Sequence, residues 1–168
     1  MCMYIELNNN KIRILFICLG NICRSPAAEG VMKAIVKREG REKDFFIDSA
    51  GIGGWHVGDL PDSRMRKHGG MRGYKFDSRA RQFSHADFAD FDYIFVMDHE
   101  NYRAVTSMAK NEEERQKVRM LTDYLVHHKD ASTVPDPYYG NGHAFEYALD
   151  LIEDACENLF ENLQKSLI

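Results

Sequence analysis

The chain has 168 residues, of which 44% are hydrophobic and 29% are charged, a balance typical of a globular protein. This length fits one domain, because two domains would each have a small core. The formal net charge of -4 argues against a general nucleic-acid binder, which usually carries a basic excess. No apolar run is long enough to cross a membrane, and the first residues lack the pattern of a signal peptide. We therefore expect a cytoplasmic protein that binds neither nucleic acid nor membrane.

The polar residues 1–10 predict a flexible N-terminal extension, and residues 11–168 predict a single domain. Residues 13–18 are rich in β-branched and aromatic residues and predict a buried strand. Further strands are expected at residues 45–49, 92–97 and 118–121. Helices are expected from an N-cap at Ser25, with Pro26 next, to a stop at Gly40, over residues 62–72, and from about Glu100. A final helix has one apolar stripe, formed by Phe145, Leu149, Ile152, Cys156, Leu159, Phe160 and Leu163.

Strands of this buried type that alternate with helices indicate parallel pairing, with helices on both faces of the sheet. We therefore predict an α/β fold, a three-layer α/β/α sandwich with a four-stranded parallel sheet. Ligands of such folds bind beyond the carboxyl ends of the strands. The first three strands are expected to end near Cys18, Ser49 and Asp98.

The four cysteines of the chain are too few for a disulfide framework at this length, so we expect free thiols. Cys156 falls on the apolar stripe of the last helix and is expected to be a small buried hydrophobe. Cys2 lies in the extension. Cys18 and Cys23 remain, and both belong to the turn-like segment that follows the first strand.

That segment predicts a phosphate-binding loop. Five residues separate Cys18 from Arg24, and a strand-to-helix loop of this length can curl so that its backbone amides and the helix N-terminus bind a tetrahedral anion. Arg24 would close the ring with its two-pronged guanidinium. Gly20 permits the backbone angles that a ring needs, and Asn21 tolerates left-handed geometry.

The same loop makes Cys18 a candidate nucleophile. Helix N-termini and nearby cations lower the pKa of a thiol from about 8.5 to roughly 3.5–7.5, so we expect a thiolate that faces the bound phosphorus, with Ser25 donating its hydroxyl to the sulfur. A plain strand-to-helix turn is the alternative. A metal site is disfavoured, because four residues between Cys18 and Cys23 suit a ligand pair poorly. The Gly-Lys-Ser/Thr of a nucleotide-binding P-loop is absent, and we expect neither metal nor cofactor.

The loop and several later motifs resemble one known family. CLGNICRSP at residues 18–26 resembles the active-site signature of the low-molecular-weight protein tyrosine phosphatases. The resemblance covers nearly all of the chain after residue 10, in the order of the family, with DSAG (48–51), WHVG (55–58), SRARQ (78–82), DYIFVMD (92–98) and DPYYG (136–140). It implies a metal-independent phosphatase that hydrolyses phosphotyrosine through a cysteinyl-phosphate intermediate.

The resemblance also implies roles for single residues. Cys18 is the nucleophile and Arg24 the phosphate clamp, while Asp136 protonates the departing phenolate and then serves as base for the hydrolytic water. The substrate and its phosphate, or another oxyanion, are expected to contact Leu19, Gly20, Asn21, Ile22, Cys23, Ser25, Trp55, Tyr138 and Tyr139. Ser49 resembles the serine that supports the loop asparagine, whereas Ser78 stands where the family often has histidine. Cys23 resembles a second loop cysteine that forms a reversible disulfide with the nucleophile, and an inert thiol is the alternative.

Three alternatives share parts of this pattern. Arsenate reductases of this fold need further cysteines around residues 80–95, and this chain has none there. Phosphoarginine phosphatases are closer, but typically carry threonine where this chain has Ile22. A binding module that captures phosphotyrosine without turnover would be expected to lose Cys18 or Asp136. The expected partner is therefore a tyrosine-phosphorylated protein of unknown identity.

Overall fold

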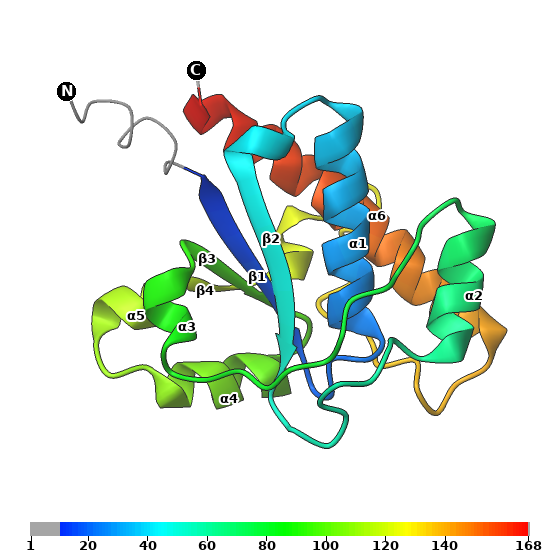
Figure 1. Cartoon of the computed structure of the whole chain (residues 1–168), viewed down its shortest axis with the longest axis horizontal. Helices are drawn as coiled ribbons and strands as arrows, with labels where there is room; N and C mark the ends of the chain where they lie inside the picture. The colour runs from blue at the N-terminus through cyan, green and yellow to red at the C-terminus, as the bar shows by residue number, and fades with distance from the viewer. Residues whose placement is uncertain (1–10, 168) are drawn as a thin grey trace.

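The computed structural model describes residues 11–167, so the predicted extension at residues 1–10 lies outside the described residues. Its sheet has four parallel strands in the order β2-β1-β3-β4 (Figure 1). The strands are β1 (Ile12–Cys18), β2 (Phe45–Gly51), β3 (Tyr93–Val96) and β4 (Val118–Met120). All four lie at the predicted places and pair in the predicted direction.

Helices cover both faces of this sheet, as predicted. In Figure 1, α1 and α6 lie on one side and α3, α4 and α5 on the other, while α2 packs against α6. The helices are α1 (Arg24–Arg38), α2 (Ser63–Met71), α3 (Asp87–Asp90), α4 (His99–Met108), α5 (Glu112–Gln116) and α6 (Gly142–Gln164). Short 3₁₀ turns span Glu42–Asp44, Leu121–Tyr124 and Lys165–Leu167. Within residues 11–167, no helix is both long and apolar enough to cross a membrane.

Two apolar cores lie on the two faces of the sheet. In β1, Ile14 and Phe16 belong to the core shared with α1 and α6, whereas Leu15 and Ile17 belong to the core under α3 and α4. This alternation follows from the two-residue period of a strand. The apolar stripe predicted for the last helix is buried at all seven positions, so the continuous apolar run of β1 and the stripe of α6 together account for the three-layer sandwich.

The prediction that Ser25 caps the first helix is wrong. Helix α1 begins at Arg24 with Cys23 at the N-cap position, and no side chain caps it. The hydroxyl of Ser25 is engaged with Cys18 and Asn21 instead, so it is not available to a backbone amide of the first turn. Pro26 still lies in that turn, where a missing N–H costs nothing. The predicted stop is confirmed, because Gly40 adopts a φ of 68° just after the helix.

Candidate active site

The loop between β1 and α1 curls at the carboxyl edge of the sheet, where the central strand β1 ends at Cys18. Asn21 has a φ of 58° and is the one non-glycine residue with positive φ in the described part of the chain. Its amide nitrogen donates to Ser25 Oγ at 2.8 Å and to Ser49 Oγ at 2.9 Å, and its Oδ1 accepts from the backbone N–H of Arg81 at 3.0 Å. Three side-chain hydrogen bonds therefore hold the strained turn in place.

Ser25 connects this network to the nucleophile predicted from the sequence. Its Oγ lies 3.0 Å from Cys18 Sγ. Because Asn21 already donates to that oxygen, the hydroxyl proton of Ser25 is free to point at the sulfur. The carbonyl of Ala50 is a more distant acceptor at 3.4 Å. The hydroxyl is thus placed as the donor that an anionic sulfur requires.

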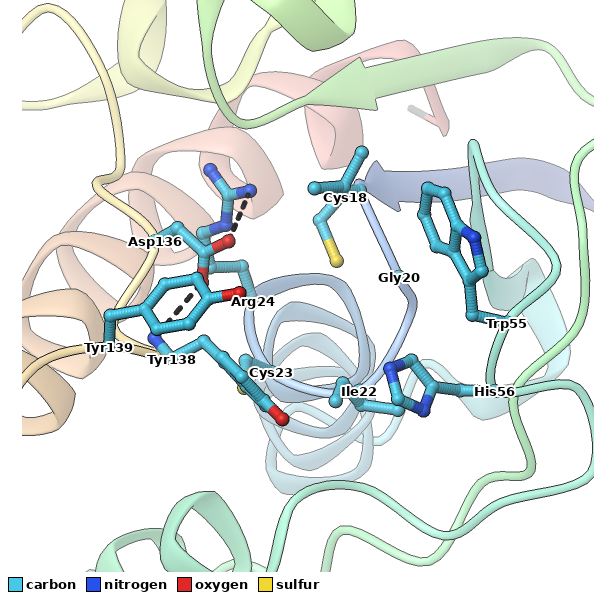
Figure 2. Close-up of a pocket in the computed structure, with 11 residues that line it drawn as sticks. Cys18, Gly20, Ile22, Cys23, Arg24, Trp55, His56, Asp136, Tyr138 and Tyr139 are labelled. Carbon is cyan, nitrogen blue, oxygen red and sulfur yellow. Dashed lines mark hydrogen bonds and ion pairs between the residues drawn. The ribbon is translucent and has the colours of Figure 1, made fainter.

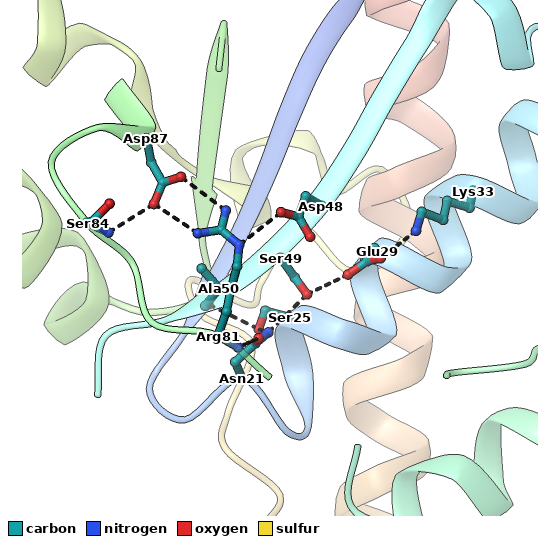
Figure 3. Close-up of polar contacts among 10 residues, drawn as sticks. All are labelled: Asn21, Ser25, Glu29, Lys33, Asp48, Ser49, Ala50, Arg81, Ser84 and Asp87. Atoms are coloured by element: carbon teal, nitrogen blue, oxygen red, sulfur yellow. Dashed lines mark hydrogen bonds and ion pairs between the residues drawn. The ribbon is translucent and has the colours of Figure 1, made fainter. Parts of the chain in front are cut away.

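A buried carboxylate completes the network (Figure 3). Ser49 Oγ donates to Glu29 Oε1 at 2.6 Å, and Lys33 Nζ lies 2.5 Å from Glu29 Oε2. Glu29 is only 3% exposed, so its charge is compensated within the protein rather than by water. The sequence analysis did not predict Glu29 as a site residue. Its spacing of four residues from Ser25 could have suggested it, because this spacing puts both side chains on the same buried face of α1.

Arg24 is held from the opposite side of the loop. Its Nη1 lies 2.6 Å from Asp98 Oδ2 and donates to the carbonyl of Val134 at 2.9 Å, while its Nη2 lies 3.6 Å from Asp136 Oδ2. Burial alone lowers the pKa of Arg24, but the charge of a Cys18 thiolate and the carboxylates of Asp98 and Asp136 outweigh it, and the net pKa is raised. The guanidinium therefore stays charged inside the protein. Asp98 was placed at a strand end from the sequence but had no predicted role.

Cys18, Arg24 and Asp136 meet in one pocket of about 300 Å³ (Figure 2). Of the residues predicted to contact substrate, those that line the pocket are Leu19, Gly20, Ile22, Cys23, Trp55, Tyr138 and Tyr139. Asn21 and Ser25 do not line it. Their side chains are buried at 2% and 0% exposure and belong to the supporting network with Ser49.

Aromatic side chains form the mouth of the pocket. Trp55 and His56 stand on one side of the Cys18 sulfur, and Tyr138 and Tyr139 stand on the other (Figure 2). Trp55 is 70% exposed and Tyr139 is 94% exposed, so these rings leave an open slot between them. A flat ring fits such a slot. His56 was not predicted as a site residue, although it is part of the WHVG motif.

The second loop cysteine is a neutral thiol in this arrangement. Cys18, Cys23 and Cys156 are all free. Burial raises the pKa of Cys23, and the nearby charges of Asp62, Cys18 and Asp136 raise it further. At neutral pH Cys23 therefore keeps its proton, which makes it a poor nucleophile. Cys18 is the cysteine whose sulfur lies beside Ser25 and in one pocket with Arg24.

Comparison with known proteins decides the family. The sequence model described as low molecular weight phosphotyrosine protein phosphatase matches residues 13–167. The chain belongs to the low molecular weight protein tyrosine phosphatases. These phosphatases are phosphoric monoester hydrolases that need no metal. A Synechocystis protein whose name places it among them is 47% identical over 157 residues, covering 94% of this chain and 99% of that protein.

Solved structures of this phosphatase family agree. A protein tyrosine phosphatase from Entamoeba histolytica, crystallised with Hepes in its active site, is 44% identical with a TM-score of 0.89, and covers 94% of this chain and 100% of that one. An arginine phosphatase from Drosophila is 33% identical with a TM-score of 0.84, over 90% of this chain and 98% of that one. The fold is thus shared by phosphatases that are named for two different substrates.

Proposed function

We propose that this phosphatase hydrolyses phosphotyrosine in proteins through a phosphocysteine intermediate formed on Cys18. The observation that carries the proposal is the meeting of three groups in one pocket: the sulfur of Cys18, the buried guanidinium of Arg24, and the carboxyl group of Asp136. A nucleophile, a cation for the phosphoryl oxygens and an acid for the leaving group are what phosphate-ester hydrolysis requires.

In the first step the sulfur of Cys18 attacks phosphorus while the bond from phosphorus to the tyrosine oxygen breaks. Arg24 and the backbone amides of the 18–24 loop hold the equatorial oxygens, whose charge is spread in the transition state. The phenolate that leaves has a conjugate acid of pKa about 10, so it needs a proton. Asp136 supplies this proton, and tyrosine departs as a neutral phenol.

In the second step water attacks the phosphorus of the phosphocysteine and the phosphorus–sulfur bond breaks. Asp136, now a carboxylate, takes a proton from that water. The products are inorganic phosphate and the Cys18 thiolate, which the hydroxyl of Ser25 is placed to stabilise. The carboxyl group of Asp136 thus returns to its protonated state, and one turnover consumes one water and no other reactant.

The walls of the pocket support an aromatic substrate over phosphoarginine, the second candidate. Ile22 lines the pocket and offers no hydroxyl to a guanidinium or to its attacking water. The slot between Trp55 and the two tyrosines suits a phenol ring, and stacking of this kind contributes about 0.5–1.5 kcal/mol beyond area burial. The second candidate comes from the similarity to the Drosophila arginine phosphatase.

The free thiols of the site support a cytoplasmic location. The proposed reaction needs Cys18 unoxidised, with Cys23 beside it as a neutral thiol. A compartment that keeps cysteines reduced meets that need.

The decisive experiment is a screen of peptides that carry phosphotyrosine, phosphoserine or phosphoarginine, with Cys18→Ser as control and EDTA present throughout. We expect turnover of phosphotyrosine alone, its loss in Cys18→Ser, and vanadate binding retained in that variant. Preferential release from phosphoarginine would favour the second candidate. Phosphotyrosine turnover that persists in Cys18→Ser would rule out the phosphocysteine mechanism.

A further inference from the structure

Arg64, in the first turn of α2, lies between two aromatic rings. Its Cζ is 5.3 Å from the ring centre of Tyr138 and 4.8 Å from that of Phe145. The planar guanidinium therefore joins the loop that carries Tyr138 to the first turns of α6. A cation over an aromatic ring is attracted by the negative electrostatic potential of the ring face. The flat guanidinium of arginine also stacks on the ring.

The same guanidinium is fixed by Asp62. Arg64 donates from Nε to Asp62 Oδ1 at 3.0 Å and from Nη2 to Oδ2 at 2.9 Å, which is a two-pronged pair. Asp62 also accepts from the backbone N–H of Arg64 and so caps α2. The backbone N–H of Asp62 in turn donates to the carbonyl of Ile22 at 2.7 Å. Arg64 is thus tied, through one intervening residue, to the loop that surrounds the phosphate site.

Tyr138 connects Arg64 to the acid. The backbone N–H of Tyr138 donates to Asp136 Oδ1 at 3.1 Å, while the other oxygen, Oδ2, lies 3.6 Å from Arg24 Nη2. The segment from residue 133 to residue 141 contains no helix or strand. Its backbone hydrogen bonds run from Val134 to Met97 and from Gly140 to Pro137, both at 2.8 Å, and neither includes Asp136. Where the carboxyl group of Asp136 sits therefore depends on where Tyr138 is held.

We propose that Arg64 is a positioning residue, which sets the distance between the acid Asp136 and the phosphate site by holding Tyr138. This proposal rests on the proposed function, since it assumes that Asp136 is the acid. Arg64 is not itself among the residues that line the pocket, although the Tyr138 ring on which it stacks is. Its effect on catalysis passes through the stack on Tyr138 and the link from Asp62 to Ile22.

A purely structural role for Arg64 is less well supported. Helices α2 and α6 are already joined by Arg72, which pairs with Glu146, Asp150 and Glu153, and by His68, whose Nδ1 lies 2.8 Å from Glu146. Arg64 is therefore only one of several side chains that join α2 to α6. Direct capture of an acidic substrate side chain is the other competing role, but two of the nitrogens of Arg64 are already occupied by Asp62.

The test compares two substrates in the variants Arg64→Ala and Arg64→Lys. Phenyl phosphate has a poor leaving group that needs the acid, whereas p-nitrophenyl phosphate needs it far less. Misplacement of the acid should lower kcat/KM for phenyl phosphate roughly three- to tenfold in Arg64→Ala, with a smaller loss for p-nitrophenyl phosphate. Arg64→Lys keeps the charge without the flat stack and should fall between Arg64→Ala and the unchanged enzyme.

The matched control is Arg119→Ala. Arg119 also lies over a tyrosine, with its Cζ 5.2 Å from the ring centre of Tyr93, but both belong to the sheet away from the pocket. Arg119→Ala should leave the ratio of the two kcat/KM values unchanged. A ratio that moves equally in both variants would mean a general effect of losing a surface stack, and would overturn the proposal.

A double-mutant cycle with Asp136→Ala completes the test. If Arg64 acts through Asp136, Arg64→Ala should cause no further loss of kcat/KM once the acid is gone. An equal loss in both backgrounds would overturn the proposal, as would an effect confined to KM for acidic phosphopeptides. These outcomes leave the proposed function intact, because that function is tested separately by the Cys18→Ser variant and by the choice among phosphorylated peptides.

Discussion

Asp98 Oδ2 lies 2.6 Å from Nη1 of Arg24, and the arginine is buried at 2% exposure. The other oxygen of Asp98 accepts from the backbone N–H of Asn101 at 2.8 Å and caps α4. One carboxylate therefore anchors Arg24, the proposed phosphate clamp, to the carboxyl end of β3. The pair also spares Arg24 the cost of an unpaired buried charge.

The first prediction concerns this pair. Asp98→Asn keeps an oxygen that can cap α4 but removes the charge that orients Arg24. A hydrogen bond to a charged group contributes about 1.5–3 kcal/mol, so we expect kcat/KM to fall by about tenfold or more and vanadate to bind more weakly. Steady-state kinetics with vanadate inhibition measure both effects. The exposed Asp77→Asn serves as control, and unchanged vanadate affinity in Asp98→Asn would contradict the role given to Asp98.

The second prediction concerns the close approach of β2 to the 18–24 loop. A Cβ at Gly51 would lie 2.9 Å from the carbonyl carbon of Gly20 and 3.0 Å from the backbone nitrogen of Asn21. Backbone atoms cannot give way as a flexible side chain can, so Gly51→Ala should displace the loop. We expect at least a tenfold loss of kcat/KM and a loss of stability of about 1–3 kcal/mol.

Gly70 offers the matched control for that substitution. A Cβ at Gly70 meets no atom within 4 Å, and the residue lies inside α2, where alanine is favoured over glycine by about 0.5–1 kcal/mol. Gly70→Ala should therefore raise the urea midpoint without changing kcat/KM. Full activity in Gly51→Ala would show that the loop tolerates the crowding, and the prediction would fail.

Much of this molecule follows from local patterns in the sequence. The apolar run at residues 13–18 located β1, and the stripe from Phe145 to Leu163 located α6, because buried side chains recur with the period of the element. The spacing of Cys18 and Arg24 predicted that one short loop before a helix brings the two side chains together, and both line one pocket. Such features depend on residues that are near one another in the chain.

The parts that the sequence did not predict depend on contacts between distant segments. Asp98 meets Arg24 across 74 positions, and Glu29 meets Ser49 across 20 positions, so no local pattern predicts either contact. The expected cap at Ser25 failed for the same reason. In the folded protein its hydroxyl contacts Cys18 and Asn21 instead. A Ser-Pro pair in the sequence does not predict these contacts.

The third prediction separates the two partners of the buried carboxylate. Glu29→Ala removes the acceptor of Ser49 and should destabilise the protein by about 1–3 kcal/mol, with lower kcat/KM because the support of Asn21 is weakened. Lys33 is 55% exposed and pairs with the carboxylate oxygen that Ser49 does not use, so Lys33→Met should destabilise the protein less than Glu29→Ala and leave kcat/KM nearly unchanged. Urea denaturation and kinetics of both variants test this asymmetry. Equal effects of the two changes would mean that the ion pair with Lys33, and not the hydrogen bond to Ser49, accounts for the contribution of Glu29 to stability and kcat/KM.

The fourth prediction concerns stability in alkali. Burial raises the pKa of Cys156, and nearby Glu157 and Glu153 raise it further; burial likewise raises the pKa of Cys23. In the unfolded chain both thiols should ionise near their ordinary pKa of about 8.5. At these two positions the folded protein then binds more protons than the unfolded chain. The contribution of these thiols to stability is therefore complete below about pH 8.5 and declines as pH rises above it.

Each thiol should lower the free energy of unfolding by up to about 1.4 kcal/mol per pH unit in that range. The measurement is a series of urea denaturations between about pH 7 and 9.5 under reducing conditions. This range stops below the ordinary pKa of tyrosine, about 10, so that Tyr74, whose pKa is raised by burial and by Glu153, does not contribute. Cys156→Ala should be less stable at neutral pH but should lose stability less steeply with rising pH. Because all other titrating groups are common to the two proteins, an identical slope would show that the Cys156 thiol ionises equally in the folded and unfolded states.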